Sequence, residues 1–171
     1  MYNEQHYGFK RLTIDNILQP DTLGIQCDIK KEQWMSCAYD FLKPQLSETV
    51  PDGTKALFEV ARGTMVYGLF FFPLYSMGTE QLFRVAENAL RQKCIALGMQ
   101  FKDGKMYFGD MLGRLTKKSV ISKDRRQVWE CFRQLRNIYS HPGNQTIITP
   151  ALAEKTLKTI TEQINLLFDN K

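Results

Sequence analysis

The stretch MGTEQLFRVAENALRQKCIAL, residues 77–97, decides the fold because its pattern is strongly helical. Apolar side chains recur three or four positions apart, as on one face of an α-helix. The members of that face are Leu82, Ala86, Ala89, Leu90 and Leu97. The polar positions of the same stretch include Glu80, Arg84, Glu87 and Arg91. An amphipathic helix of this length has to bury its apolar face, so the pattern predicts a helix packed in a core.

Upstream of this helix, residues 55–76 read KALFEVARGTMVYGLFFFPLYS. The run Gly68–Pro73 is compatible with a buried strand, but its continuation into 77–97 favours a buried helix kinked at Pro73. We expect these aromatic side chains in the core rather than at an interface. Residues 31–46 show a further helical spacing, and the first thirty residues, with their turn formers, predict an irregular arm.

Downstream, KDGK at 102–105 is typical of a turn, and Asp110 is placed to cap a short helix over 111–117. Residues 125–139 form another amphipathic pattern through Val128, Phe132, Leu135 and Tyr139. The last helix is expected to begin with Thr149 as N-cap and Pro150 as first helical residue. Its apolar positions are Ala153, Leu157, Ile160, Ile164 and Leu167.

These patterns predict an all-α protein, an antiparallel bundle of four to five helices with an irregular N-terminal arm. We expect residues 1–54 to supply the arm and a first helix that packs on the bundle. Residues 55–171 then form the bundle itself.

The composition suits a globular domain with a real core, since 43% of the 171 residues are hydrophobic and 12% aromatic. No apolar run reaches the roughly 20 residues of a membrane span, and the N-terminus lacks the apolar stretch of a signal peptide. A cytoplasmic location without membrane attachment is expected. The four cysteines are dispersed and there are two histidines, which argues against a zinc site. We therefore expect reduced, mostly buried thiols and no metal or other cofactor.

The positive charge is concentrated in one part of the chain. The net charge is +5, but residues 91–136 hold twelve Lys/Arg against four Asp/Glu, which is +8. Such a sector is typical of a protein that binds polyanions, although a solvated helix face explains the bias equally well. The candidate RNA contacts in this sector are Lys117, Lys118, Lys123, Arg125 and Arg126.

The stretch LRNIYSHPGN, 135–144, places an arginine and a histidine at a helix end. Pro142 disfavours a helical conformation for the residue before it, so His141 should lie just past the helix. Arg136 offers a charged fork for two phosphate oxygens, and His141 can exchange a proton near neutral pH. Asn137 and Ser140 could orient phosphate or imidazole. Alternatively, His141 interacts with the last helical carbonyl groups and Arg136 is a surface charge.

Arg136-Asn137-Ile138-Tyr139-Ser140-His141 resembles the Arg-x(4–6)-His motif of the HEPN domain (higher eukaryotes and prokaryotes nucleotide-binding). The segments EQLFRVAENALR, YFGDMLGRL and ITPALAEKTLKTITEQINLLF fit the family's general appearance, so the resemblance covers about residues 55–168. It implies a helical homodimer that joins two motifs in one cleft. One subgroup carries a tyrosine two residues after the histidine, where this chain has Gly143; regulation through that tyrosine is not expected here.

Many proteins of this family are metal-independent endoribonucleases in toxin–antitoxin or phage-defence systems. The resemblance implies that His141 is the general acid/base, that Arg136 stabilises the scissile phosphate and that Asn137 supports them. Glu87 is a weaker candidate, as an acidic group on an earlier helix. Such an enzyme would cut single-stranded RNA to 2′,3′-cyclic phosphate and 5′-hydroxyl ends, under a cognate antitoxin or regulatory protein.

Two other functions remain open from the sequence. One is a non-catalytic module of the same fold that binds RNA or nucleotides or interacts with other proteins. The other is a helical homodimer with structural duties.

Overall fold

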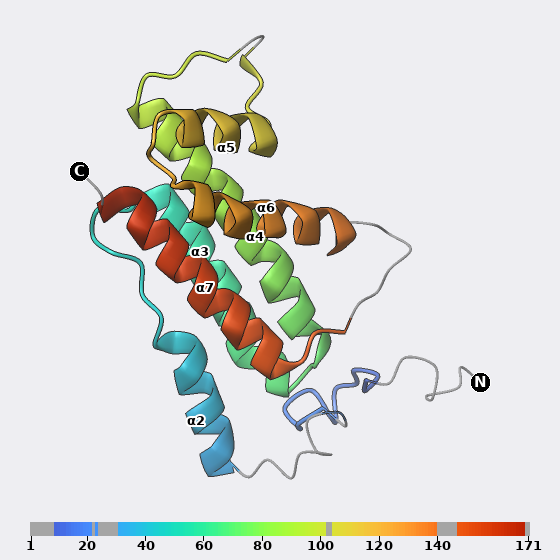
Figure 1. Cartoon of the computed structure of the whole chain (residues 1–171). Coiled ribbons are helices and arrows are strands. Elements are labelled where there is room, and N and C mark those ends of the chain that lie inside the picture. Colours follow the sequence, from blue (N-terminus) through green and yellow to red (C-terminus); the bar gives the residue numbers. More distant parts are fainter. Residues whose placement is uncertain (1–8, 22, 24–30, 102–103, 140–146, 170–171) are drawn as a thin grey trace.

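The computed structural model describes residues 9–21, 23, 31–101, 104–139 and 147–169, and this part of the chain contains helices and no strand (Figure 1). The prediction of an all-α protein is confirmed. The helices are α2 (Lys31–Leu42), α3 (Asp52–Val66), the 3-10 turn η2 (Tyr67–Leu69), α4 (Pro73–Ala96), α5 (Phe108–Lys117), α6 (Lys123–Tyr139) and α7 (Pro150–Asp169). None of them is long and apolar enough to cross a membrane.

Helix α4 is the centre of the molecule and packs against α3, α5, α6 and α7. Four of the five apolar positions predicted for its buried face, Leu82, Ala86, Ala89 and Leu90, are fully buried. The fifth prediction is wrong, because α4 ends at Ala96 and Leu97 is its C-cap, with 41% of its surface exposed. Phe83 and Val85 are also fully buried, so α4 is covered on more than one face.

Pro73 begins a helix instead of kinking one, which corrects the prediction for residues 55–76. Helix α3 ends at Val66, and Pro73 is the first residue of α4. Proline is well tolerated there because the first helical N–H has no partner within the helix. The chain reverses between the two helices, and they pack antiparallel (Figure 1).

Helices α4 and α7 run in the same direction, which differs from the expected antiparallel bundle. At their first turns, the backbone N–H of Ile148 donates to Ser76 Oγ at 3.0 Å. At their last turns, the Lys93 ammonium lies 5.4 Å from the centre of the Phe168 ring. Helices α5 and α6, which lie between them in the chain, run across the direction of α4 and α7 (Figure 1).

Helix α7 itself matches the sequence pattern closely. All five side chains predicted for its apolar face, Ala153, Leu157, Ile160, Ile164 and Leu167, are fully buried. The predicted N-cap is also present, since Thr149 Oγ1 accepts from the backbone N–H of Leu152 at 3.4 Å.

Two further helix ends differ from the prediction. Helix α2 ends at Leu42, four residues early, just before Pro44. Arg62 of α3 donates there to the carbonyl groups of Leu42 and Pro44, at 2.7 and 2.9 Å. Helix α5 begins at Phe108, so Asp110 lies in its first turn and does not cap it. A carboxylate in the first turn still suits the positive end of the helix dipole.

Helix α6 buries Trp129 and Phe132, while the other predicted apolar positions, Val128, Leu135 and Tyr139, are half-buried against the core. The arm is attached to the start of α4. Asp21 is fully buried, and its carboxylate accepts from the backbone N–H of Phe72 at 3.0 Å. The described part of the arm therefore contacts the start of α4.

Candidate functional site

The C-terminal end of α6 is held firmly on α4 by aromatic contacts. The Tyr139 ring stacks on Phe83, with centroids 5.9 Å apart and planes 10° from parallel. Phe132, two turns earlier, lies 6.4 Å from the same Phe83 ring. Because Phe83 is fully buried, these contacts fix the position of the last two turns of α6. The side chains on those turns are therefore presented from a rigid base.

Arg136 lies in the last turn of α6 and pairs with Glu87 of α4. Its Nη2 is 3.0 Å from Glu87 Oε2, and the two side chains are 39% and 21% exposed. The structure thus brings together two of the residues singled out from the sequence, forty-nine positions apart. A carboxylate at this distance orients the guanidinium and leaves some of its five N–H donors for another anion.

Arg136 also lines a small hollow with Glu80, Phe83 and Arg84 of α4. Its volume of about 70 Å³ corresponds to roughly two water molecules in the liquid. Two guanidinium groups and a carboxylate surround it, with Glu87 beside them. Positive charge at this end of α6 is therefore largely compensated.

Of the other site residues predicted in this motif, the structure describes Asn137 but not Ser140 or His141. Asn137 is exposed, next to Arg136. His141 and Ser140 lie outside the described residues, so the predicted pairing of guanidinium and imidazole stays a prediction. No group of three His, Cys, Asp or Glu side chains within the described residues is arranged to hold a metal ion.

Four of the five predicted RNA-binding cations lie together at the corner between α5 and α6. Lys117 and Lys118 end α5, Lys123 and Arg126 begin α6, and all four are exposed. Arg126 and Arg136 are ten residues apart, which is about 15 Å along a helix axis. The basic corner and the Arg136 pair therefore lie at opposite ends of α6.

Arg125, the fifth predicted cation, fastens α6 to α7. Its Nε donates to Gln163 Oε1 at 2.9 Å, and its Nη2 donates to the Gln163 carbonyl at 3.0 Å. Burial lowers the pKa of the Arg125 guanidinium, and the Glu162 carboxylate raises it by less. The side chain is half-buried and its donors are engaged, so it is a less suitable RNA contact than its four neighbours.

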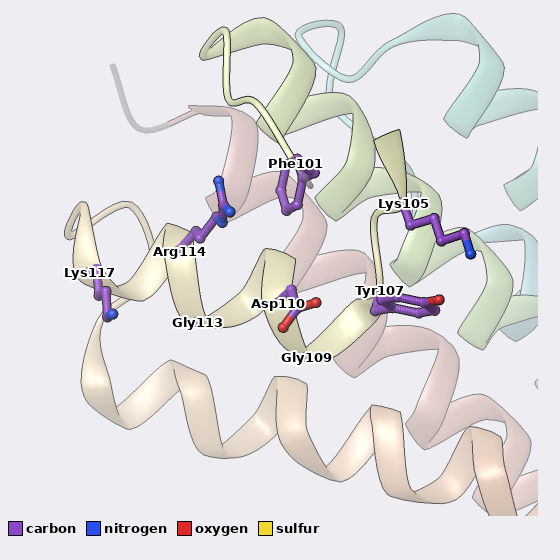
Figure 2. A pocket seen from close by; sticks show the side chains of 8 residues that line it. All are labelled: Phe101, Lys105, Tyr107, Gly109, Asp110, Gly113, Arg114 and Lys117. Carbon is purple, nitrogen blue, oxygen red and sulfur yellow. The ribbon is translucent and has the colours of Figure 1, made fainter. Parts of the chain in front are cut away.

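The outer side of α5 carries a larger crevice, of about 560 Å³, that the sequence patterns did not single out (Figure 2). Tyr107 and Lys105 lie at one end and Lys117 lies at the other. Arg114 and Phe101 lie side by side along this crevice, with the guanidinium carbon 4.3 Å from the ring centre. The available signal was the spacing of Gly109 and Gly113, which removes two side chains from one helix face.

Comparisons with protein-family models, with curated proteins and with solved structures give no match for this chain.

Proposed function

We propose that this protein is a metal-independent RNA endonuclease of HEPN type, working as a homodimer in a toxin–antitoxin or phage-defence setting. The observation that carries the proposal is the Arg136–Glu87 pair, 3.0 Å across, on the rigid last turn of α6. It presents a half-exposed guanidinium five residues before His141. The setting and the dimer rest on the sequence resemblance alone.

In the proposed reaction, the oxygen of a ribose 2′-hydroxyl attacks the adjacent phosphorus, and the bond from phosphorus to the 5′-oxygen breaks. His141 takes the proton of the 2′-hydroxyl and its dimer counterpart gives a proton to the leaving 5′-oxygen. The products are a 2′,3′-cyclic phosphate and a 5′-hydroxyl. Acid–base catalysis of this kind contributes about 10²- to 10⁴-fold to the rate.

Arg136 would stabilise the negative charge that grows on the phosphate oxygens as the 2′-oxygen attacks. Glu87 holds the guanidinium in place before the substrate arrives, so little reorganisation is needed. Asn137, exposed beside Arg136, would be the supporting polar group. No metal ion is needed for these steps.

The test is cleavage of a labelled single-stranded RNA in the presence of EDTA. Wild type should cut it, an all-DNA strand should stay intact, and His141→Ala and Arg136→Ala should each lower the rate by at least about 100-fold. Arg133→Ala is the matched control, because Arg133 lies one turn earlier on α6 and pairs with Glu130. Cleavage that survives His141→Ala would exclude the proposed mechanism.

A second candidate is a non-catalytic module that binds RNA, and the exposed basic corner favours it. Lys117, Lys118, Lys123 and Arg126 offer four phosphate contacts from two adjoining helix ends. This function would be favoured over the nuclease if the wild-type protein binds RNA without cutting it and its affinity falls when these residues are changed to glutamate.

A further inference from the structure

The crevice on the outer side of α5 combines three features: open backbone, aromatic rings and positive charge (Figure 2). Gly113 leaves part of the helix uncovered, since a Cβ built there would have no neighbour within 4 Å. Tyr107, at the start of α5, is 62% exposed. A large aromatic ring that stays exposed beside an open cavity of about 560 Å³ has room for a flat partner.

Positive charge surrounds this space. Among the described residues, Lys105, Arg114 and Lys117 line the crevice together with the carboxylate of Asp110. A neighbouring hollow of about 460 Å³ shares Arg114 and Lys117 and adds Lys118. The two hollows therefore form one basic surface across α5, which we call the α5 crevice, with Arg114 and Lys117 between them.

Arg114 is pre-positioned within the α5 crevice. Its guanidinium lies over the Phe101 ring at 4.3 Å, and one of its N–H groups donates to the Gln100 carbonyl. These contacts hold the planar cation still and use few of its donors. Because the Arg114 side chain is already ordered, a phosphate that binds it costs little side-chain conformational entropy.

We propose that the α5 crevice binds single-stranded RNA, with a base stacked on Tyr107 and the neighbouring phosphates on Lys105, Arg114 and Lys117. An aromatic platform beside a basic groove is the usual way in which proteins hold single strands without reading their sequence. The inference rests on the proposed function in one respect, that RNA is the substrate. It adds a second contact region for the strand, on α5.

The experiment measures binding of a fluorescent 2′-O-methyl RNA of about 12 nucleotides, a length suited to such grooves, by anisotropy. This RNA cannot be cut through its 2′-oxygen, so the full wild-type chain can be used. Gly113→Leu should fill the crevice without changing charge, and Tyr107→Ala should remove the stacking surface. Each should weaken binding by about 5- to 150-fold, the range seen when a stacking contact is lost.

Matched controls separate the α5 crevice from general effects on the fold. Gly63→Leu makes the same change in α3, where a Cβ also has no neighbour within 4 Å. Tyr39→Ala removes a tyrosine that is 64% exposed on α2. Both should leave affinity unchanged. Lys117→Gln should reduce the slope of log K against log salt concentration by about 0.7, which Lys155→Gln on α7 should not do.

The outcomes distinguish this site from the proposed catalysis. If His141→Ala abolishes cleavage while Gly113→Leu and Tyr107→Ala bind RNA like wild type, the α5 crevice proposal is wrong and the nuclease stands. If wild type cuts nothing but the two variants lose affinity, the α5 crevice stands without the nuclease. Failure of wild type to bind the RNA at low salt overturns the α5 crevice. The proposal is also wrong if polyglutamate displaces the labelled RNA as readily as unlabelled RNA does and Tyr107→Ala has no effect. That result would indicate an acidic protein partner.

Discussion

The contact between α3 and α4 at Gly78 leads to a prediction in which the same substitution has opposite effects at two glycines. A Cβ added at Gly78 of α4 would lie 2.6 Å from Met65 Cγ and 3.0 Å from the Ala61 carbonyl oxygen of α3. Met65 and Ala61 are fully buried, so neither can move into solvent. At Gly63, in the last turn of α3, the added Cβ would meet nothing within 4 Å.

Two contributions to the free energy of unfolding are involved. Alanine is a better helix former than glycine by about 1 kcal/mol, and this gain is common to both positions. Overpacking a buried contact costs about 1–3 kcal/mol, and this cost arises at Gly78 alone. Gly63→Ala should therefore stabilise the protein by about 0.5–1 kcal/mol. The difference between the two variants isolates the steric cost, about 1–3 kcal/mol.

The assay is guanidinium unfolding followed by the fluorescence of the fully buried Trp129, with midpoints and slopes compared. At about 2–4 °C per kcal/mol for a chain of this size, the melting temperatures of the two variants should differ by about 2–12 °C. Met65→Val should relieve part of the cost of Gly78→Ala, which a double-mutant cycle would detect as favourable coupling. If Gly78→Ala stabilises the protein as much as Gly63→Ala does, the close packing of α3 on α4 is refuted.

Three further predictions concern other parts of the chain. Asp21→Ala should lower the free energy of unfolding by about 1–3 kcal/mol in urea unfolding, because it leaves buried N–H groups without their acceptor. Burial raises the pKa of Cys94 to about 11, so iodoacetamide at pH 8 should modify the exposed Cys131 and spare Cys94, as peptide mass mapping would show. Since the unfolded chain loses the Cys94 proton first, stability should also fall between pH 9.0 and about 11, and by less in Cys94→Ala. Arg125→Ala should destabilise the fold by about 1–3 kcal/mol with RNA affinity kept, whereas Lys118→Glu should weaken RNA binding with thermal stability kept.

The elements that the sequence predicted well are those whose burial follows a regular spacing. Helix α7 shows this, because its five apolar positions and its Thr149 N-cap are set by contacts within about four residues. The central part of α4 is similar. Errors arose where local rules allow two outcomes. Proline both kinks helices and begins them, and only the packing of α3 back onto α4 decides that Pro73 begins one.

The candidate site was less predictable, because it depends on contacts between distant segments. Nothing in the local sequence relates Glu87 to Arg136; the stacking of Tyr139 on Phe83 brings their helices together. Likewise, the basic residues of 114–126 cannot be told apart from the sequence, yet Arg125 donates a hydrogen bond to α7 whereas Lys117 and Lys118 are exposed. The α5 crevice requires Phe101 and Arg114 to meet after an intervening turn, which no periodicity predicts.

These contacts also bear on how the proposed enzyme would hold its substrate. Arg136 is compensated by Glu87, and the hollow beside it holds only about 70 Å³, so this end of α6 offers little binding energy to a long polyanion. Exposed cations lie elsewhere, in the α5 crevice on the neighbouring helix and at the basic corner, where Arg126 is about 15 Å from Arg136 along α6. Binding of the strand there would position the scissile phosphate without strengthening the interaction of the unreacted substrate with Arg136. Interactions at Arg136 could then strengthen chiefly as charge develops in the transition state, which is the condition for a catalytic gain.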